Sequence, residues 1–323
     1  MRICIPLARA WRCWRRQEPD KMNTPMTKNS SGSRTSLWLL TLLLACLLQG
    51  CGGSVEVAPE QFEKVDQLVS RMTDNIEAAE SVTLVTDIDH ARLGAAAGTP
   101  MAPTRVVIFS DAELESSLFA LNPLTALDMP LRILAFAPAD AGDASVIFNS
   151  FDYLVSRYSL AGDELAGIRT RYEAGIDRAL AGIPATAVAG FPTDVMQPDG
   201  ITTIASPFNF KETLERVVAA IDAQDDTMHF GAVSFPATDE QAGAELLLFG
   251  APGPGARGMK SAQTLGLDGF CQKFLVWENS AGDVFLSFND LLALAERQGP
   301  GASVPLRVID FRLGSVFEEA LTQ

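Results

Sequence analysis

The chain has 323 residues, 47% of them apolar, and a formal net charge of -15. This length allows two average domains, and the apolar fraction is too high for a disordered protein. The first 50 residues hold eight of the 25 basic residues and two of the 40 acidic ones, so the remainder carries a net charge near -21. Such an acidic body repels a phosphate backbone, and we expect no nucleic-acid partner.

The first 50 residues have the organisation of a bacterial export signal. An apolar run over 37–48 follows a segment that contains Lys28 and Arg34 and no acidic residue. The run is too short to span a bilayer as a helix, which needs about 20 residues, but it has the length of a signal-peptide core. We therefore predict a signal peptide over 1–50, and interpret 1–21 as a mis-assigned start that precedes Met22 or Met26.

The sequence Leu48-Gln49-Gly50-Cys51 resembles the lipobox of bacterial lipoproteins. This resemblance implies cleavage before Cys51, lipid on its sulfur, palmitate or a similar acyl group on the new N-terminus, and a tether over 51–58. Several acyl chains, at ~0.8 kcal/mol per buried methylene, anchor such a protein practically permanently in a lipid membrane. Gly52 stands where an aspartate would favour the inner membrane, so we expect an outer-membrane protein facing the periplasm. An ordinary secretory signal or an uncleaved anchor is the alternative.

The rest of the chain repeats itself at a shift near 140 residues. The matched segments are Val106–Phe109 with Leu246–Phe249, Leu127-Asp128 with Leu267-Asp268, Val146–Asn149 with Leu286–Asn289 and, after a one-residue slip, Ile133–Phe136 with Phe274–Trp277. Because their order is preserved, we predict two tandem copies of one domain. The copies are assigned to 59–180 and 201–323, joined by a linker over 181–200 that has Gly and Pro spaced through it. Each copy is expected to bury its own core.

In the first copy, a helical stripe of apolar residues runs from Phe62 to Ile76. A weak strand precedes it at 55–57. Strands are predicted near 82–88, 105–109, 131–136 and 145–148, followed by a helix over 164–180.

The second copy begins with a short strand at 201–204. Asn209, with Glu212 three residues later, predicts the start of a helix. Strands follow at 228–235, 245–249, 271–277 and 284–288, and an apolar stripe from Leu306 to Ala320 predicts the last helix. The order strand, helix, four strands, helix indicates an α+β fold of two tandem helix-backed antiparallel sheets.

Several segments resemble the family called domain of unknown function 302. They are Ser206–Leu214, Glu245–Gly250, Lys273–Glu278 and Leu286–Asp290, together with Ile88-Asp89-His90 and Leu127–Leu131, which look like the family's Ile-Asp-His and Leu-Pro-Leu-Lys signatures. The resemblance covers roughly 60–180 and 201–323. It implies a sheet backed by helices, like one half of the TATA-binding protein, and no mechanism. Each copy keeps only part of the pattern, since the family's glycine-rich stretch is degraded at Gly250–Gly255 and missing at Ser110-Asp111-Ala112.

Asp87, Asp89 and His90 form the candidate ligand-binding cluster. On a strand, residues 87 and 89 point to the same side, so two carboxylates and a ring nitrogen can meet a cation or share a proton. The alternative interpretation, which we favour, is that Asp89 caps the following Ala-rich helix and His90 packs behind it. Metal sites usually take ligands from other segments as well, so we assign no metal site.

Two further features have ordinary structural interpretations. The segment Gly250–Gly258, which ends near Arg257 and Lys260, can cradle an anion but lacks the spacing of a phosphate loop, so we predict a plain inter-strand loop. Cys271 aligns with Leu131 of the first copy and is expected to be a buried apolar residue without a disulfide partner.

Two classes of function remain. The first is a non-catalytic envelope lipoprotein whose paired domains bind a small molecule or another envelope protein. The second is a metal-binding or enzymatic site around Asp87, Asp89 and His90. We expect binding without turnover, no catalytic residues and no cofactor, and an apolar groove between helices and sheet would favour this class. Two partial sites that complete each other would instead require His90 to lie near Gly250–Gly258.

Overall fold

The computed structural model describes residues 58–322 except 140–141, 190–199, 236, 238–241 and 300. The predicted signal peptide, the lipid-attachment residue Cys51 and the predicted strand at 55–57 lie outside these residues. The described residues belong to one compact unit. Within the described part of the chain, no helix combines the length and the apolar character needed to cross a membrane.

The first repeat forms a four-stranded antiparallel sheet in the order β1-β2-β3-β4. Its elements are α2 (Pro59–Glu77), β1 (Thr83–Asp89), α3 (His90–Ala96), β2 (Thr104–Ser110), α4 (Ala112–Leu121), η2 (Pro123–Asp128), β3 (Leu131–Phe136), β4 (Ser145–Ile147), α5 (Phe151–Tyr158) and α6 (Leu165–Ala179). A short turn, η3 (Ala185–Ala187), follows in the predicted linker.

The second repeat forms a five-stranded antiparallel sheet in the order β5-β9-β8-β7-β6. Its elements are β5 (Ile201–Ser206), α7 (Phe210–Asp222), β6 (Met228–Phe235), β7 (Ala244–Gly250), α8 (Pro252–Met259), η5 (Gln263–Gly266), β8 (Gln272–Glu278), β9 (Val284–Asn289), α9 (Leu291–Arg297) and α10 (Val304–Thr322). Asn209 caps α7 as expected, because its Oδ1 accepts from the Glu212 amide at 3.0 Å. The predicted α+β class, with two helix-backed antiparallel sheets, is confirmed.

The strand register confirms the repeat. Phe109 lies opposite Leu131 in the first sheet, and Phe249 lies opposite Gln272 in the second. The pairs Leu134–Ile147 and Leu275–Ser287 then place Phe148 and Phe288 at equivalent positions. The same register makes Cys271 the counterpart of Pro130, so its predicted alignment with Leu131 was wrong by one residue.

Segment 252–259 is the helix α8, so the prediction of an inter-strand loop was wrong. Glycine and proline disfavour helix on their own, but Pro252 stands at the first position, where it is tolerated. The glycines allow close packing: a Cβ on Gly258 would lie 3.0 Å from both Leu306 and Phe270. Tertiary contacts therefore override local propensity here.

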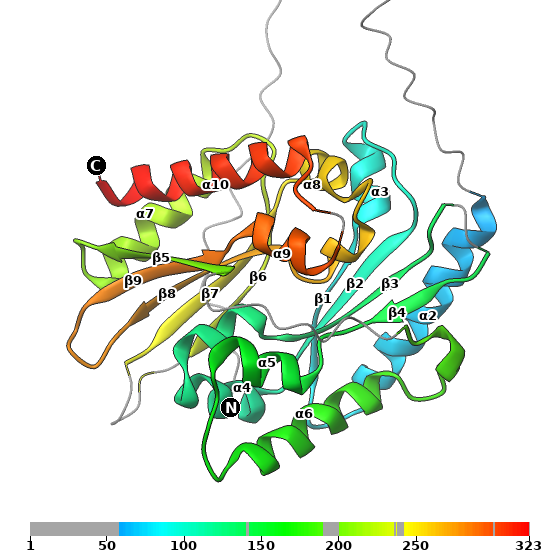
Figure 1. Ribbon diagram of the computed structural model, residues 1–323, viewed down its shortest axis with the longest axis horizontal. Coiled ribbons are helices and arrows are strands. Elements are labelled where there is room, and N and C mark those ends of the chain that lie inside the picture. The colour runs from blue at the N-terminus through cyan, green and yellow to red at the C-terminus, as the bar shows by residue number, and fades with distance from the viewer. Residues whose placement is uncertain are drawn as a thin grey trace, which may run out of the picture. The chain divides into compact units, whose positions relative to one another are not determined.

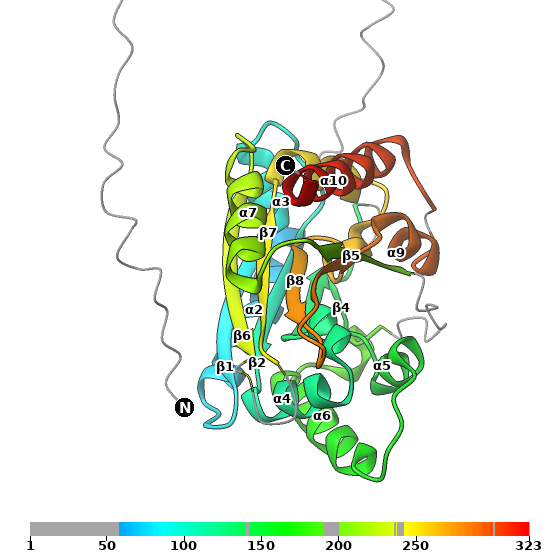
Figure 2. The same cartoon turned by 90° about the vertical axis from the view of Figure 1, so that its left-hand side faces the viewer.

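Each sheet is covered on its outer face by helices of its own repeat. Helices α2 and α6 pack on the first sheet, and α7 and α10 pack on the second (Figures 1 and 2). The opposite faces share one hydrophobic cluster, which contains Val106 and Leu134 of one repeat and Leu246 and Leu275 of the other. A second cluster also contains residues of both repeats. The prediction that each copy buries its own core applies to the outer face of the second sheet, whose cluster contains residues of that repeat alone, but it is wrong for the inner faces, which the two copies bury together.

Candidate binding groove and repeat interface

The carboxylates of the predicted ligand cluster are occupied by arginines. Asp87 and Asp89 lie on the same side of β1, as expected, and both face Arg105 of β2. Asp89 Oδ1 also caps α3 by accepting from the Arg92 amide at 2.8 Å. Asp66 of α2 pairs with both arginines, at 2.6 Å in each case. The arrangement is an ion-pair network that ties α2 and α3 to the sheet.

His90 is buried, with 7% of its surface exposed. Burial lowers its pKa to about 4, so the ring is neutral at pH 7. The interpretation that Asp89 caps the helix and His90 packs behind it is confirmed. Among the described residues, no group of three or more His, Cys, Asp or Glu side chains is placed to hold a metal ion.

The structure does bring His90 against the glycine-rich segment of the other repeat. His90 shares a small cavity with Gly250, Gly255 and Phe270. The cavity measures about 20 Å³, which is room for one water molecule. The partial signatures of the two copies therefore meet at the repeat interface, but the space between them is too small for a substrate.

A larger groove lies between the helices and the sheet of the second repeat. It has a volume of about 370 Å³, within the range of small-molecule sites. Its walls are the end of α7, the first half of α10, α8 and the adjoining ends of β7 and β8. The residues that line it are Ile221, Gln224, Asp226, Thr227, Phe249, Ala251, Pro254, Arg257, Gln272, Val304, Pro305, Val308, Ile309, Arg312, Leu313 and Val316.

Few polar groups interrupt the apolar wall of the groove. Arg312 donates to Gln224 Oε1 at 3.1 and 2.6 Å and lies 3.5 Å from Asp226. The Nε2 atom of Gln272 is buried and has no hydrogen-bond partner. Val304 and Val308, on the rim, are 74% and 61% exposed. The groove thus offers apolar surface and a small number of donors, which is the usual composition of a ligand site.

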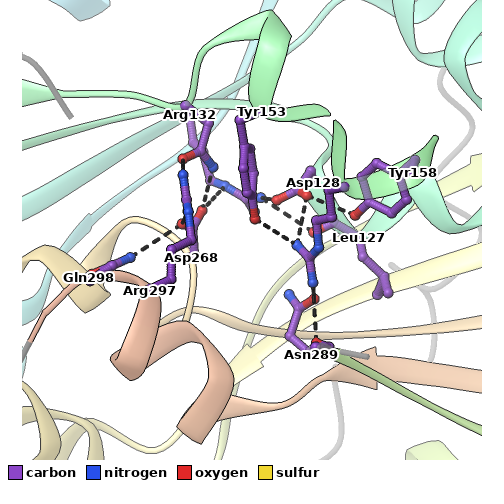
Figure 3. A network of polar contacts seen from close by, with 12 residues as sticks. Leu127, Asp128, Arg132, Tyr153, Tyr158, Asp268, Asn289, Arg297 and Gln298 are labelled. Carbon is purple, nitrogen blue, oxygen red and sulfur yellow. Dashed lines mark hydrogen bonds and ion pairs between the residues drawn. The ribbon is translucent and has the colours of Figure 1, made fainter. Parts of the chain in front are cut away.

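A network of charged side chains, which the sequence reasoning missed, is buried at the repeat interface (Figure 3). Asp128 is its centre in the first repeat, where it accepts at 2.7 Å from each of Arg132, Arg157 and the Tyr158 hydroxyl. Burial alone would raise the pKa of Asp128, but the arginines outweigh burial and hold that pKa below its ordinary value. The carboxylate is therefore ionised although it is 4% exposed.

The network is built twice, in a reciprocal way. Arg157 donates to Asn289 of the second repeat at 2.7 Å. Arg297, its counterpart, donates to Asn149 of the first repeat at 2.9 Å and pairs with Asp268 at 3.1 Å. Each arginine thus joins the aspartate of its own repeat to the asparagine of the other.

A signal for this network was present in the sequence. Asp128 and Asp268, like Asn149 and Asn289, were part of the matched segments, and Arg157 and Arg297 differ by the same 140 positions. A polar residue that occurs at the same position of both copies, within an otherwise apolar segment, indicates a polar contact that both copies make. Here that contact crosses the interface between the repeats.

Cys271 is 5% exposed and lies in the cluster between the sheets. Burial raises its pKa to about 12, so the thiol is protonated at neutral pH and is no nucleophile. Its predicted role as a buried apolar residue is confirmed.

Comparisons with known proteins find relatives that match part of the chain. Fluoride-specific ion channel FluC 1 of Brucella suis biovar 1 (strain 1330) is 35% identical over 109 residues, which are 32% of this chain and 42% of that protein. FluC 1 of Brucella abortus biovar 1 (strain 9-941) is 35% identical over 109 residues, 32% of this chain and 40% of that protein. The chain thus matches less than half the length of these relatives.

An uncharacterized conserved protein DUF302 from Bacillus stearothermophilus, of known crystal structure, aligns with a TM-score of 0.30 and 14% identity, over 38% of this chain and 95% of that one. The family model described as "Domain of unknown function DUF302" matches residues 57–183 and 202–309. These segments coincide with the two structural repeats and take up most of the sequence. The chain therefore belongs to the DUF302 family and carries two of its domains in tandem.

Proposed function

We propose that this protein is a lipid-anchored binding protein of the bacterial envelope, whose ligand is a small and largely apolar molecule. The observation that carries the proposal is the groove of about 370 Å³ between α7, α8, α10 and the second sheet. A groove of this size encloses most of a small ligand, and its apolar wall gains roughly 25 cal/mol for each Å² removed from water.

The exposed valines on the rim support a binding role. Val304 and Val308 present apolar surface to solvent beside the groove. A ligand that fills the groove and contacts the rim removes this surface from water, whereas the unliganded protein gains nothing from exposing it.

The chemistry of the lining supports binding rather than turnover. The lining residues include no histidine, cysteine, lysine or serine. Asp226 is the one carboxylate among them, and it lies 3.5 Å from Arg312. The one hydroxyl in the lining belongs to Thr227, and no histidine or lysine lines the groove to activate it as a nucleophile.

The envelope address is supported by the export signal and the lipobox at Leu48–Cys51. Acylation of Cys51 would hold the groove near the membrane surface, where apolar molecules partition. This part of the proposal is independent of the groove, and it has its own test. We expect Cys51→Ala to accumulate as unprocessed precursor or unlipidated protein. Mass spectrometry that finds unmodified Cys51 in the mature protein would contradict the anchor and leave the groove untouched.

The groove is tested with an apolar fluorescent probe added to the purified full chain. Val308→Trp places an indole over the groove and should weaken probe binding roughly tenfold, a loss of about 1.4 kcal/mol. Phe311→Trp is the matched control, because Phe311 lies on the same helix, is 76% exposed and does not line the groove. Equal effects of the two substitutions, or no saturable binding by the unaltered chain, would refute the groove as a ligand site. Native mass spectrometry of protein extracted from its own membrane would identify the bound molecule.

A further inference from the structure

At the repeat interface, each repeat places an asparagine and a basic side chain at equivalent positions. In the first half of the interface, both of these side chains lie against one oxygen of Asp268. Asn149 Oδ1 accepts from Arg297, which leaves the amide nitrogen of Asn149 as a donor. That nitrogen donates to Asp268 Oδ1 at 2.9 Å, and Arg132 Nε lies 3.3 Å from the same oxygen. One carboxylate oxygen thus meets an amide and a cation.

In the second half the equivalent donors are Asn289 and Lys273. Phe274 lies opposite Phe288, so the next position of the ladder sets Lys273 beside Asn289 on the face toward the other sheet. Side chains opposite each other on antiparallel strands have Cβ atoms about 5 Å apart. Both are buried, with 3% and 6% of their surface exposed.

Within the part of the chain that the structure describes, these two donors have no protein acceptor. Lys273 Nζ and Asn289 Nδ2 are buried atoms without a hydrogen-bond partner. The amide cannot turn to supply its oxygen to the lysine, because Asn289 Oδ1 accepts from Arg157 at 2.7 Å and turning would set two donors against each other.

Asp128, the counterpart of Asp268 in the first repeat, already accepts hydrogen bonds from other side chains. Asp128 Oδ1 accepts from Arg132, and its Oδ2 accepts from Arg157 and Tyr158. A lysine side chain is also shorter than the arginine at the corresponding position, and no ion pair joins Lys273 to a described carboxylate.

Lys273 also differs from the arginines of the interface in its charge partners. Arg132, Arg157 and Arg297 each pair with Asp128 or Asp268, whereas no carboxylate among the described residues pairs with Lys273. An unpaired buried charge is strongly destabilising, whereas a paired and hydrogen-bonded one is tolerated. The buried ammonium group of Lys273 therefore calls for a partner of opposite charge.

We propose that Lys273 and Asn289 bind a small inorganic monoanion of the chloride class between the repeats. The anion accepts from Lys273 Nζ and Asn289 Nδ2, as in the other half the Asp268 oxygen accepts from Asn149 and forms an ion pair with Arg132. The burial of both donors selects for a small ion, and the unpaired ammonium group selects for an anion over water. The site is separate from the apolar groove and does not depend on the function proposed for it.

The direct test is crystallisation of the full chain with bromide in place of chloride. A bromide anomalous peak within hydrogen-bonding distance of both Lys273 Nζ and Asn289 Nδ2 is the expected result. A neutral water at that position, or no density between the two donors, would overturn the proposal. This measurement needs no variant, so it stands even where a substitution at this buried position prevents folding.

A second test measures thermal stability in sodium gluconate, whose anion is too large to enter, with chloride added at constant ionic strength. The midpoint of unfolding should rise by roughly 5 °C at about a hundredfold excess over Kd and then follow a saturation curve. Lys273→Met should abolish the chloride response, whereas Lys211→Met, at a side chain that is 84% exposed, should retain it. A response that persists in Lys273→Met, or that sulfate reproduces, would refute the site.

Discussion

The outer helix of the first repeat lies close on its sheet, whereas the outer helix of the second leaves a groove. In α6 the glycine Gly175 precedes the buried Ile176, and a Cβ on that glycine would lie 3.0 Å from Leu131. In α10 a valine, Val316, precedes the buried Phe317 and lines the groove. The two copies share one fold, so we expect the size of the side chain at this helix–sheet contact to influence whether the layer is closed or open.

The inner faces of the two sheets are more alike, because both copies place an aspartate, an arginine and an asparagine at equivalent positions there. Asp128 and Asp268 each meet an arginine of their own repeat, and each arginine reaches an asparagine of the other. The outer helix faces differ between the copies, whereas these contacts of aspartate, arginine and asparagine at the interface occur in both.

The largest expected effect comes from breaking the shared interface at Asp128. Asp128→Asn removes the charge that compensates Arg132 and Arg157, so we expect a loss of about 3–5 kcal/mol in the free energy of unfolding. Urea unfolding measures it, and the transition should remain single because the repeats share hydrophobic clusters. Asp152→Asn is the control: that side chain is 71% exposed and pairs on the surface with Arg169, so its effect should stay within about 0.5 kcal/mol. Two separate transitions in the unaltered chain would contradict a shared core.

The next prediction concerns the pH dependence of stability, which differs between the repeats. Burial raises the pKa of Glu115 in α4 to about 7, and the hydrogen bond from Ser110 only partly opposes this. The folded protein binds this proton more tightly than the unfolded chain. Stability from Glu115 is therefore complete below pH 4.5 and falls as the pH rises through 7, by on the order of 3 kcal/mol.

Glu115→Gln should remove that part of the pH dependence, measured as the difference between variant and unaltered chain from pH 4 to 8. The difference also cancels the contribution of His90, which has the opposite sign because its pKa is lowered to about 4. Glu113→Gln, on the same helix with a 73% exposed side chain, should leave the profile unchanged. The second repeat has Gly255 at the position corresponding to Glu115, 140 residues on, and no equivalent carboxyl. Parallel pH profiles for Glu115→Gln and the unaltered chain would sink this account.

The sealing of the first repeat is tested at Gly175 itself. Gly175→Val forces α6 away from Leu131, and we expect a loss of about 1–2 kcal/mol, typical of an overpacked contact. Gly167→Val is the matched control, since a Cβ at Gly167 on the same helix meets no atom within 4 Å. If Gly175→Val is as stable as Gly167→Val in thermal unfolding, the glycine does not set the distance between helix and sheet.

The smallest effect concerns helix capping, which also differs between the copies. Asn209 caps α7, whereas Ala58 precedes α2 without a side-chain cap. Asn209→Ala should therefore cost about 1 kcal/mol, and Ala58→Asp should gain roughly half as much, because it supplies an acceptor to unpaired helix amides. Differential scanning calorimetry of both variants measures this. An unchanged midpoint for Asn209→Ala would show that the cap is redundant.

The alternation and the helical periodicity of apolar residues were sufficient to predict most of the strands and helices. The strands at 131–136 and 228–235 were predicted to the residue, and the Asn209 cap was confirmed. The helix α8 was not predictable, because its glycines favour a loop until Phe270 and Leu306 pack against them. The candidate cluster was predicted in part: Asp89 caps α3, but no pattern showed that Arg105 and Asp66 would occupy the carboxylates.

The sequence alone determined that two copies of one α+β domain follow each other, because period-2 and period-3.6 patterns report which faces must leave water. It did not determine what covers those faces. Whether a face is buried by its own helices or by the other copy depends on contacts between segments more than 100 residues apart, such as Arg157 with Asn289. The groove under α10 and the buried charges between the sheets arise from such contacts. Only the tertiary structure decided them, because distance in space and balance of charge are properties of the assembled fold and not of any one segment.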